Sequence, residues 1–205
     1  MTVHGKRDSG EVRSRTLDLL AQVRIPNPSK VISSYPHDLS GGMRQRVAIA
    51  MAMANNPELI IADEPTTALD VTVQAQILRL LDELRRETGM SLLFITHDFG
   101  VVSQICDTVA VMYAGQIVEL APVDRILKSP QHPYTKNLIR CVPKKSSIQS
   151  ELFSIPGLPP SPDNLPSGCS FAPRCSGAKD KCRNTVPDWT GDFQSGYRCY
   201  FPESA

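Results

Sequence analysis

Two short apolar runs, each followed directly by polar side chains, set the fold class of this sequence. Leu59–Ala62 is bounded by prolines and continues into Asp63 and Glu64, and Ser91–Ile95 continues through a threonine into His97. Runs of this length between turn residues predict buried strands. Open α/β sheets place ligands at the carboxyl ends of their strands. The sequence therefore predicts an α/β fold with Asp63, Glu64 and His97 together at such an edge.

The residues at this edge have the chemistry that phosphoryl transfer needs. Asp63 can hold Mg²⁺ through the water shell of the ion, and Glu64 can orient or deprotonate an attacking water. His97 could hydrogen-bond a γ-phosphate and steady that water against Glu64. A lone histidine is more often structural, so its role depends on its place beside the carboxylates.

A glycine-rich segment precedes the first strand and predicts a helix start that could meet a phosphate. Ser40 stands where a helix N-cap is expected, and Gly41 and Gly42 let the backbone approach a ligand closely. Apolar residues at helical spacing follow them. Alone, Ser-Gly-Gly reads as the start of a capped core helix; followed by the strand and its carboxylates, it favours phosphate contact.

The other elements are expected from periodicity and turn residues. Helices are predicted over 12–23, 72–86 and 99–105, with Gly89 ending the second of them. A two-strand hairpin of 109–113 and 116–120 is expected at the end of the sheet. Two short helices should follow over 123–128 and 134–141.

Three motifs in fixed order resemble those of ABC-type ATPases: LSGGMRQR at 39–46, LIIADEPTTALD at 59–70 and FITHD at 94–98. The longer run from Tyr35 and the tail GCSFAPRCSGAKDKC look most like ATP-binding subunits of bacterial dipeptide and oligopeptide importers. This resemblance implies a partial ABC-type P-loop ATPase domain that uses ATP and Mg²⁺ to energise peptide import. The implied partners are a second ATPase subunit, membrane permease subunits and a peptide-binding protein. The implied location is peripheral, on the cytoplasmic face of the membrane.

The resemblance also assigns residues to the nucleotide. It implies that Glu64 and His97 are catalytic, that Asp63 positions Mg²⁺ through water, and that the signature segment contacts ATP held by the opposite subunit. The residues implied to contact that ATP are Ser40, Gly41, Gly42 and Gln45. Asp70 matches the loop that touches the partner subunit; by itself it would read as a helix cap, and both roles are compatible.

One family feature has no counterpart here. The loop G-x-x-x-x-G-K-[ST], whose N–H groups and lysine cradle phosphates, does not occur, because Gly5-Lys6 is followed by Arg7 and preceded by no glycine. The chain is therefore expected to correspond to the carboxyl-terminal part of a longer subunit and to be inactive alone. An alternative is a non-catalytic module that only lends its signature to a partner. A DNA-repair or structural-maintenance ATPase is disfavoured, because no long heptad run is present.

The expected division is a partial ATPase domain over 1–142, with a helical segment over 1–56 and a catalytic core over 57–142, followed by an arm and a four-cysteine region over 143–205. Residues 155–168 are rich in proline and should form no regular element. The tail has little apolar area, so a tetrathiolate metal site would supply its stability. The candidate ligands are Cys169, Cys175, Cys182 and Cys199.

The resemblance implies that these four thiols hold a structural four-iron, four-sulfur cluster. Their spacing lacks a paired C-x-x-C, which weakens zinc as the metal without excluding it. Four free reduced thiols in a loose tail are the remaining alternative. Cys106 and Cys141 stand apart and are expected to be buried apolar residues.

Composition excludes several other classes. A formal net charge of +1 over 205 residues argues against a nucleic-acid partner, which would call for a basic stripe. No apolar run approaches the ~18 residues needed to cross a bilayer, and the first residues lack the apolar core of a signal peptide. A cytosolic protein is therefore expected, in which six cysteines are poor candidates for disulfides.

Overall fold

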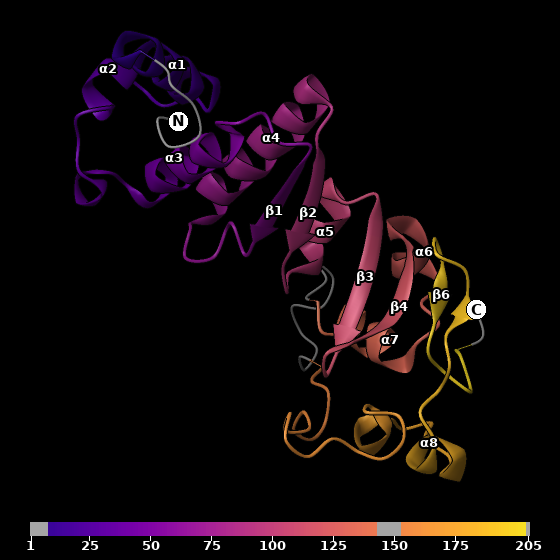
Figure 1. Cartoon of the computed structure of the whole chain (residues 1–205). Helices are drawn as coiled ribbons and strands as arrows, with labels where there is room; N and C mark the ends of the chain where they lie inside the picture. The colour runs from indigo at the N-terminus through magenta and orange to yellow at the C-terminus, as the bar shows by residue number, and fades with distance from the viewer. Residues whose placement is uncertain (1–7, 143–152, 204–205) are drawn as a thin grey trace. The chain divides into compact units, whose positions relative to one another are not determined.

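The computed structural model describes residues 8–142 and 153–203 (Figure 1). It divides into two compact units, one ending at His97 and the other beginning at Asp98. Within the described ranges, no helix is both long and apolar enough to cross a membrane. Each unit is described by itself below.

The first unit joins two parallel strands to a set of helices. Its elements are α1 (Ser9–Gln22), α2 (Pro28–Val31), η1 (Pro36–Asp38), α3 (Gly41–Met53), β1 (Leu59–Asp63), α4 (Val71–Thr88) and β2 (Ser91–Ile95). β1 pairs with β2 in parallel from Leu59↔Ser91 to Asp63↔Ile95. The α/β class and the shared carboxyl edge of the two strands are thus confirmed.

Helix α4 connects the two strands and supplies much of the core of the first unit. The leucines and isoleucine on its inner face are almost fully buried: Ile77, Leu80, Leu81 and Leu84. Gly89 ends the helix in the left-handed conformation, with φ of 72°, and its N–H donates to the carbonyl of Arg85. A glycine is favoured there because a side chain strains this conformation.

One set of alternate sheet residues stays open to solvent. Leu59 and Ile61 of β1 and Leu93 and Ile95 of β2 are all exposed. Alternate residues of a strand share one face, so this two-stranded sheet carries an uncovered apolar face.

The second unit contains a four-stranded antiparallel sheet of order β3-β4-β6-β5. Its elements are α5 (Phe99–Ile105), β3 (Thr108–Tyr113), β4 (Gln116–Pro122), α6 (Val123–Lys128), α7 (Pro133–Arg140), η2 (Ala172–Arg174), α8 (Asp180–Asn184), β5 (Thr190–Gly191) and β6 (Gly196–Tyr197). The predicted hairpin is present as β3 and β4. Its expected place at the end of the first sheet stays a prediction. Within the second unit, β4 pairs with β6 from the tail.

Glycine explains why this pairing was not predicted. β6 has only two residues, and a Cβ at Gly196 would lie 2.5 Å from the Trp189 ring. A two-residue strand that contains a glycine shows no strand pattern in the sequence. The missing side chain nevertheless lets this backbone pair with β4 while it lies close to the indole ring of Trp189. The main chain of Arg198 extends the contact by donating to the carbonyl of Val118 at 2.8 Å.

The core of the second unit gathers aromatic rings from both the hairpin and the tail. Phe171 is almost fully buried, with its ring centroid 5.3 Å from those of Tyr113 and Tyr134 and 5.9 Å from that of His132. Aromatic pairs at such distances stabilise beyond the area they bury. The tail is therefore packed onto the hairpin and is not loose.

The proline-rich arm is tied down by one arginine. Arg174 donates from Nε to the carbonyl of Pro156 at 2.9 Å and from Nη2 to that of Ile155 at 3.1 Å. Residues 155–168 form no helix or strand, as predicted. The start of the expected arm, 143–152, lies outside the described residues. Cys106 and Cys141, expected to be buried, are only half-buried.

Candidate functional site

The carboxylate of Glu64 lies at the carboxyl edge of the two parallel strands. Its main-chain N–H donates to the carbonyl of Ile95 at 2.9 Å, which joins the end of β1 to the end of β2. His97 is two residues after Ile95, and its Nδ1 lies 3.1 Å from Oε1 of Glu64. The predicted pair is thus brought together, and both side chains are open to solvent.

A threonine that the sequence interpretation missed completes this arrangement. Oγ1 of Thr67 donates to Oε2 of Glu64 at 2.8 Å. The hydrogen bonds from Thr67 and, second, from His97 lower the pKa of Glu64 below its usual value. A hydroxyl three residues after the carboxylate, in a loop, was the only available signal.

The backbone around Glu64 is strained. Glu64 and Ala68 both adopt positive φ, 43° and 64°, although neither is glycine. Such conformations cost ~1–3 kcal/mol each and persist where surrounding contacts fix them, often at functional sites. Here the contacts with Ile95, Thr67 and His97 fix the position of the Glu64 carboxylate.

Asp63 is the last residue of β1 and its side chain is exposed. Among the described residues, the carboxylate of Asp63 makes no hydrogen bond and no ion pair. Carboxylate oxygen is a ligand type that suits Mg²⁺, which in proteins usually keeps several waters and takes further oxygens from phosphates. The residue therefore fits the predicted magnesium role by chemistry and position.

The signature segment forms the start of helix α3. Ser40 is the N-cap and its Oγ accepts from the N–H of Met43 at 3.3 Å. A Cβ at Gly42 would lie 2.7 Å from Cγ1 of Val73, and one at Gly41 would lie 3.4 Å from Leu69. Packing thus explains why both positions are glycine, because the absence of side chains lets α3 approach the start of α4 closely. Gln45 lies half-buried on the same helix.

Asp70 lies in the same neighbourhood as the signature segment. It is the N-cap of α4 and its Oδ1 accepts from the N–H of Val73 at 2.9 Å. The helix-cap reading is therefore correct, and the predicted contact with a partner subunit stays a prediction. Leu69 and Val73, on either side of Asp70, are the residues that face the two signature glycines.

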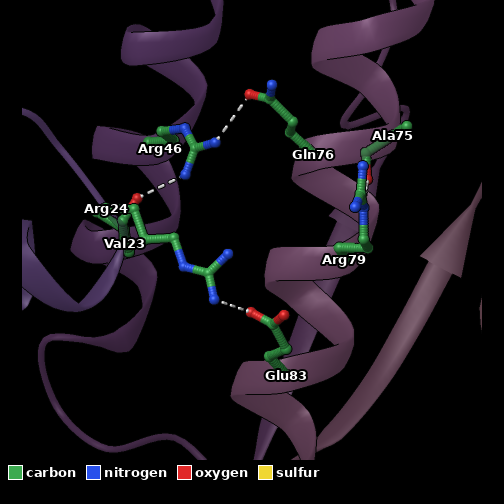
Figure 2. A network of polar contacts seen from close by, with 7 residues as sticks. All are labelled: Val23, Arg24, Arg46, Ala75, Gln76, Arg79 and Glu83. Atoms are coloured by element: carbon green, nitrogen blue, oxygen red, sulfur yellow. Dashed lines mark hydrogen bonds and ion pairs between the residues drawn. The ribbon is translucent and has the colours of Figure 1, made fainter.

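Figure 2 shows an arginine network between α3, α4 and the end of α1 that sequence reasoning missed. Arg46 donates to the carbonyl of Val23 at 2.9 Å and to Oε1 of Gln76 at 3.3 Å. Arg24 pairs with Glu83 at 2.6 Å. Burial, and then the nearby charge of Arg24, lower the pKa of Arg46. Arg46 belongs to the signature motif, so this network fixes the helix that carries Ser40.

The four tail cysteines line one cavity of about 290 Å³ in the second unit. Burial raises the pKa of the Cys169 and Cys175 thiols and raises that of Cys199 to about 11. The charge of other cysteines of the set, including Cys182, also raises the pKa of each of these thiols. In the described ranges, no group of three or more His, Cys, Asp or Glu side chains could hold a metal ion as the side chains stand.

His132 also lines this cavity, and it is 1% exposed. Its main-chain N–H donates to Oε2 of the buried Glu119 at 2.9 Å, and its Nδ1 accepts from the N–H of Tyr134 at 3.1 Å. Burial lowers the pKa of His132 to about 4. Spacing alone had assigned this histidine no chemistry.

Comparisons with known proteins agree with the motifs. The family described as "Oligopeptide/dipeptide transporter, C-terminal region" matches residues 118–182, and the family "ABC transporter" matches residues 1–67. A "Putative peptide import ATP-binding protein" of Brucella ovis is 50% identical over 206 residues, covering 97% of this chain and 61% of the relative. The "Probable D,D-dipeptide transport ATP-binding protein DdpD" of Escherichia coli is 49% identical, covering 94% of this chain and 59% of the relative. The chain thus spans about three fifths of the length of these relatives.

The structure also resembles a solved ATP-binding cassette. The "Dimeric Structure of MJ0796, a Bacterial ABC Transporter Cassette" matches with a TM-score of 0.51 and 34% identity, over 58% of this chain and 50% of that one. A second structure of MJ0796, with the same score, identity and coverage, is described as a post-hydrolysis state bound to ADP and Pi. Over that stretch the chain has the fold of an ABC cassette. Together these matches agree with the motifs: the chain is similar to the ATP-binding subunits of peptide ABC importers.

Proposed function

We propose that the chain carries the hydrolytic and signature parts of an ATP-binding subunit that energises peptide import. The observation that carries this proposal is the Glu64 carboxylate, held at the shared edge of β1 and β2 by Thr67 at 2.8 Å and His97 at 3.1 Å. This carboxylate, whose pKa is lowered, is ionised at neutral pH and can accept a hydrogen bond from the attacking water.

Each residue at this edge has a separate task in the proposed reaction. Glu64 orients and deprotonates the attacking water, and His97 holds Glu64 on one side while its ring is free to meet a γ-phosphate. Asp63 holds Mg²⁺ through water. The ion, when bound with ATP, neutralises charge that develops on the phosphates.

The signature segment acts on ATP held by a second ATPase subunit. Ser40, Gly41, Gly42 and Gln45 contact that nucleotide from the start of α3, and Asp70 touches the partner. The close packing of the glycines on Leu69 and Val73 supports this assignment, because it couples the signature to the Asp70 loop. Permease subunits and a peptide-binding protein complete the importer, with this subunit on the cytoplasmic face.

The uncovered apolar face of β1 and β2 fits a place within a larger cassette. Leu59, Ile61, Leu93 and Ile95 are exposed here. Burying one such side chain contributes about 1.5–3 kcal/mol, so a cassette that covers this face gains considerable stability. The proposed division of the chain is the one predicted, an ATPase part over 1–142 and an appendage over 143–205.

The appendage holds a structural four-iron, four-sulfur cluster on Cys169, Cys175, Cys182 and Cys199. The support is that all four line one cavity. Zinc stays the alternative metal for the same four thiols. Anaerobically purified protein should be brown and contain iron and acid-labile sulfide; colourless protein with one zinc per chain would keep the site but reject the cluster.

The function is tested by ATP turnover. The 205 residues alone are expected to bind ATP weakly and not to turn it over, because they contain no G-x-x-x-x-G-K-[ST] loop. Joined to such a loop from the DdpD relative, they should hydrolyse ATP, and Glu64→Gln should abolish turnover. Turnover that Glu64→Gln leaves unchanged would reject the catalytic role.

The same experiment separates the proposal from a module that only lends its signature. That alternative is favoured by the intact packing of the signature on α4. A module that only supplies its signature segment would stimulate ATP turnover by a complete partner subunit. That turnover would not change when Glu64 of the module is replaced. Dependence on Glu64 in the joined protein would therefore exclude it.

A further inference from the structure

We infer that His132 donates a hydrogen bond from Nε2 to the sulfurs of the group bound by the four cysteines. This inference rests on the proposed metal site and adds to it a residue that is not a ligand. Donors of this kind tune iron–sulfur sites by stabilising negative charge on sulfur.

The position of the ring proton follows from the contacts of His132. Nδ1 accepts the N–H of Tyr134 at 3.1 Å, as the N-cap of α7. A nitrogen that accepts a hydrogen bond carries no proton, so in the neutral ring the proton is on Nε2. The ring edge that carries Nε2 is thus the part of His132 left to form the cavity wall.

The imidazole is held by the N–H of Tyr134 and by the Phe171 ring, and Glu119 holds the main chain beside it. Glu119, itself 1% exposed, accepts from the main-chain N–H groups of Gln131 at 2.7 Å and His132 at 2.9 Å. Phe171 packs against the imidazole with ring centroids 5.9 Å apart. A donor fixed in this way loses little conformational freedom when it binds an acceptor.

The other polar side chains of the cavity wall have different partners. Lys179 lies over the Phe201 ring at 4.1 Å, Glu203 pairs with Lys136 at 2.6 Å, and the hydroxyl of Tyr200 donates to a main-chain carbonyl at 3.0 Å. In the part of the chain that the structure describes, no hydrogen bond is found for Nε2 of His132, and Nε2 is not one of the fully buried side-chain atoms that lack a partner. Nε2 is therefore open to the cavity, where a sulfur of the bound group accepts its hydrogen.

Two substitutions separate the donor from the helix cap. His132→Asn keeps an oxygen where Nδ1 caps α7, since asparagine is a preferred N-cap, but it lacks an atom at Nε2. His132→Gln places an amide nitrogen near Nε2 but caps the helix poorly. The two variants therefore lose different functions of the same side chain.

The measurement is a potentiometric titration of the bound cluster in anaerobically purified protein, followed by its visible and electron paramagnetic spectra. Added electrons come from the titrant, and the reduced cluster carries more negative charge. His132→Asn should shift the reduction potential to a more negative value at unchanged iron content, and His132→Gln should stay closer to wild type. Equal potentials in wild type and His132→Asn would overturn the inference while leaving the cluster in place. Wild-type protein without iron and sulfide would overturn both.

Discussion

Nδ1 of His97 lies 3.1 Å from Oε1 of Glu64, although 33 positions separate the two residues in sequence. The contact arises because β1 and β2 are parallel and in register, so that the residue after each strand lies at one edge. Glu64 reaches this contact through a left-handed backbone conformation, with φ of 43°. The strained backbone and the contact with His97 together fix the position of this carboxylate, as its proposed catalytic role requires.

The first prediction concerns Glu64→Gln in the protein joined to a phosphate-binding loop. Glutamine keeps the shape and can still accept from Thr67, but it cannot take a proton from water. Turnover should fall by ~10²–10⁴-fold, whereas the equilibrium affinity for ATP should stay the same. Binding is measured with a fluorescent ATP analogue and turnover by phosphate release. Loss of binding would make Glu64 a structural residue instead of a base.

The second prediction concerns the pKa of Glu64 and its cause. The hydrogen bond from Thr67 is the largest contribution that lowers this pKa. Thr67→Val should therefore raise it, and Thr67→Ser, which keeps the hydroxyl, should not. Carbon NMR of the Glu64 carboxyl, assigned by its loss in Glu64→Gln, measures the titration directly.

The sign of the pH dependence follows from the same shift. Because the folded pKa of Glu64 is lowered, its contribution to stability is present above the unfolded pKa and is lost as pH falls through the folded pKa. The acid limb of turnover should likewise move to higher pH in Thr67→Val. An acid limb that stays in place would remove Thr67 from the mechanism.

The strands and long helices could be predicted because their signals are local. The inner face of α4 follows a helical period, and Leu59–Asp63 is an apolar run between turn residues. The helix start at Ser9 lies before the predicted start at residue 12, because the side chain of Asp8 accepts from the N–H of Gly10 at 3.2 Å. Capping of this kind extends a helix through polar residues that show no periodicity.

The contacts that could not be predicted join distant residues through few atoms. Glu119 accepts N–H groups 12 and 13 positions away, and β6 has only two residues, one of them Gly196. Neither the contacts of Glu119 nor the strand β6 produces a pattern that can be recognised in the sequence. The candidate site shows the same limit, since Glu64 and His97 follow strand ends whereas Thr67 and Arg46 act through side-chain geometry alone.

The third prediction tests the packing role of Gly42. A Cβ there would lie 2.7 Å from Cγ1 of Val73, so Gly42→Ala should destabilise the first unit by about 1–3 kcal/mol, less any gain in helix propensity. Shortening the opposing side chain in Gly42→Ala/Val73→Ala should recover part of that loss relative to the two single variants. Hydrogen exchange of α3 and α4 measures the effect. Additive losses would show that the two residues do not press on each other.

The last prediction uses Thr135, which is fully buried and whose Oγ1 has no hydrogen-bond partner. Replacing a buried, unpaired hydroxyl by a methyl group removes a desolvation penalty of ~1–3 kcal/mol, so Thr135→Val should stabilise the second unit. Thr135→Ser keeps the hydroxyl and loses one methyl, which should cost ~1 kcal/mol. The only tryptophan, Trp189, lies in the second unit and reports its unfolding in urea by fluorescence. The expected order of stability is Val above Thr above Ser; a valine variant less stable than the serine variant would show that the hydroxyl is bonded in solution.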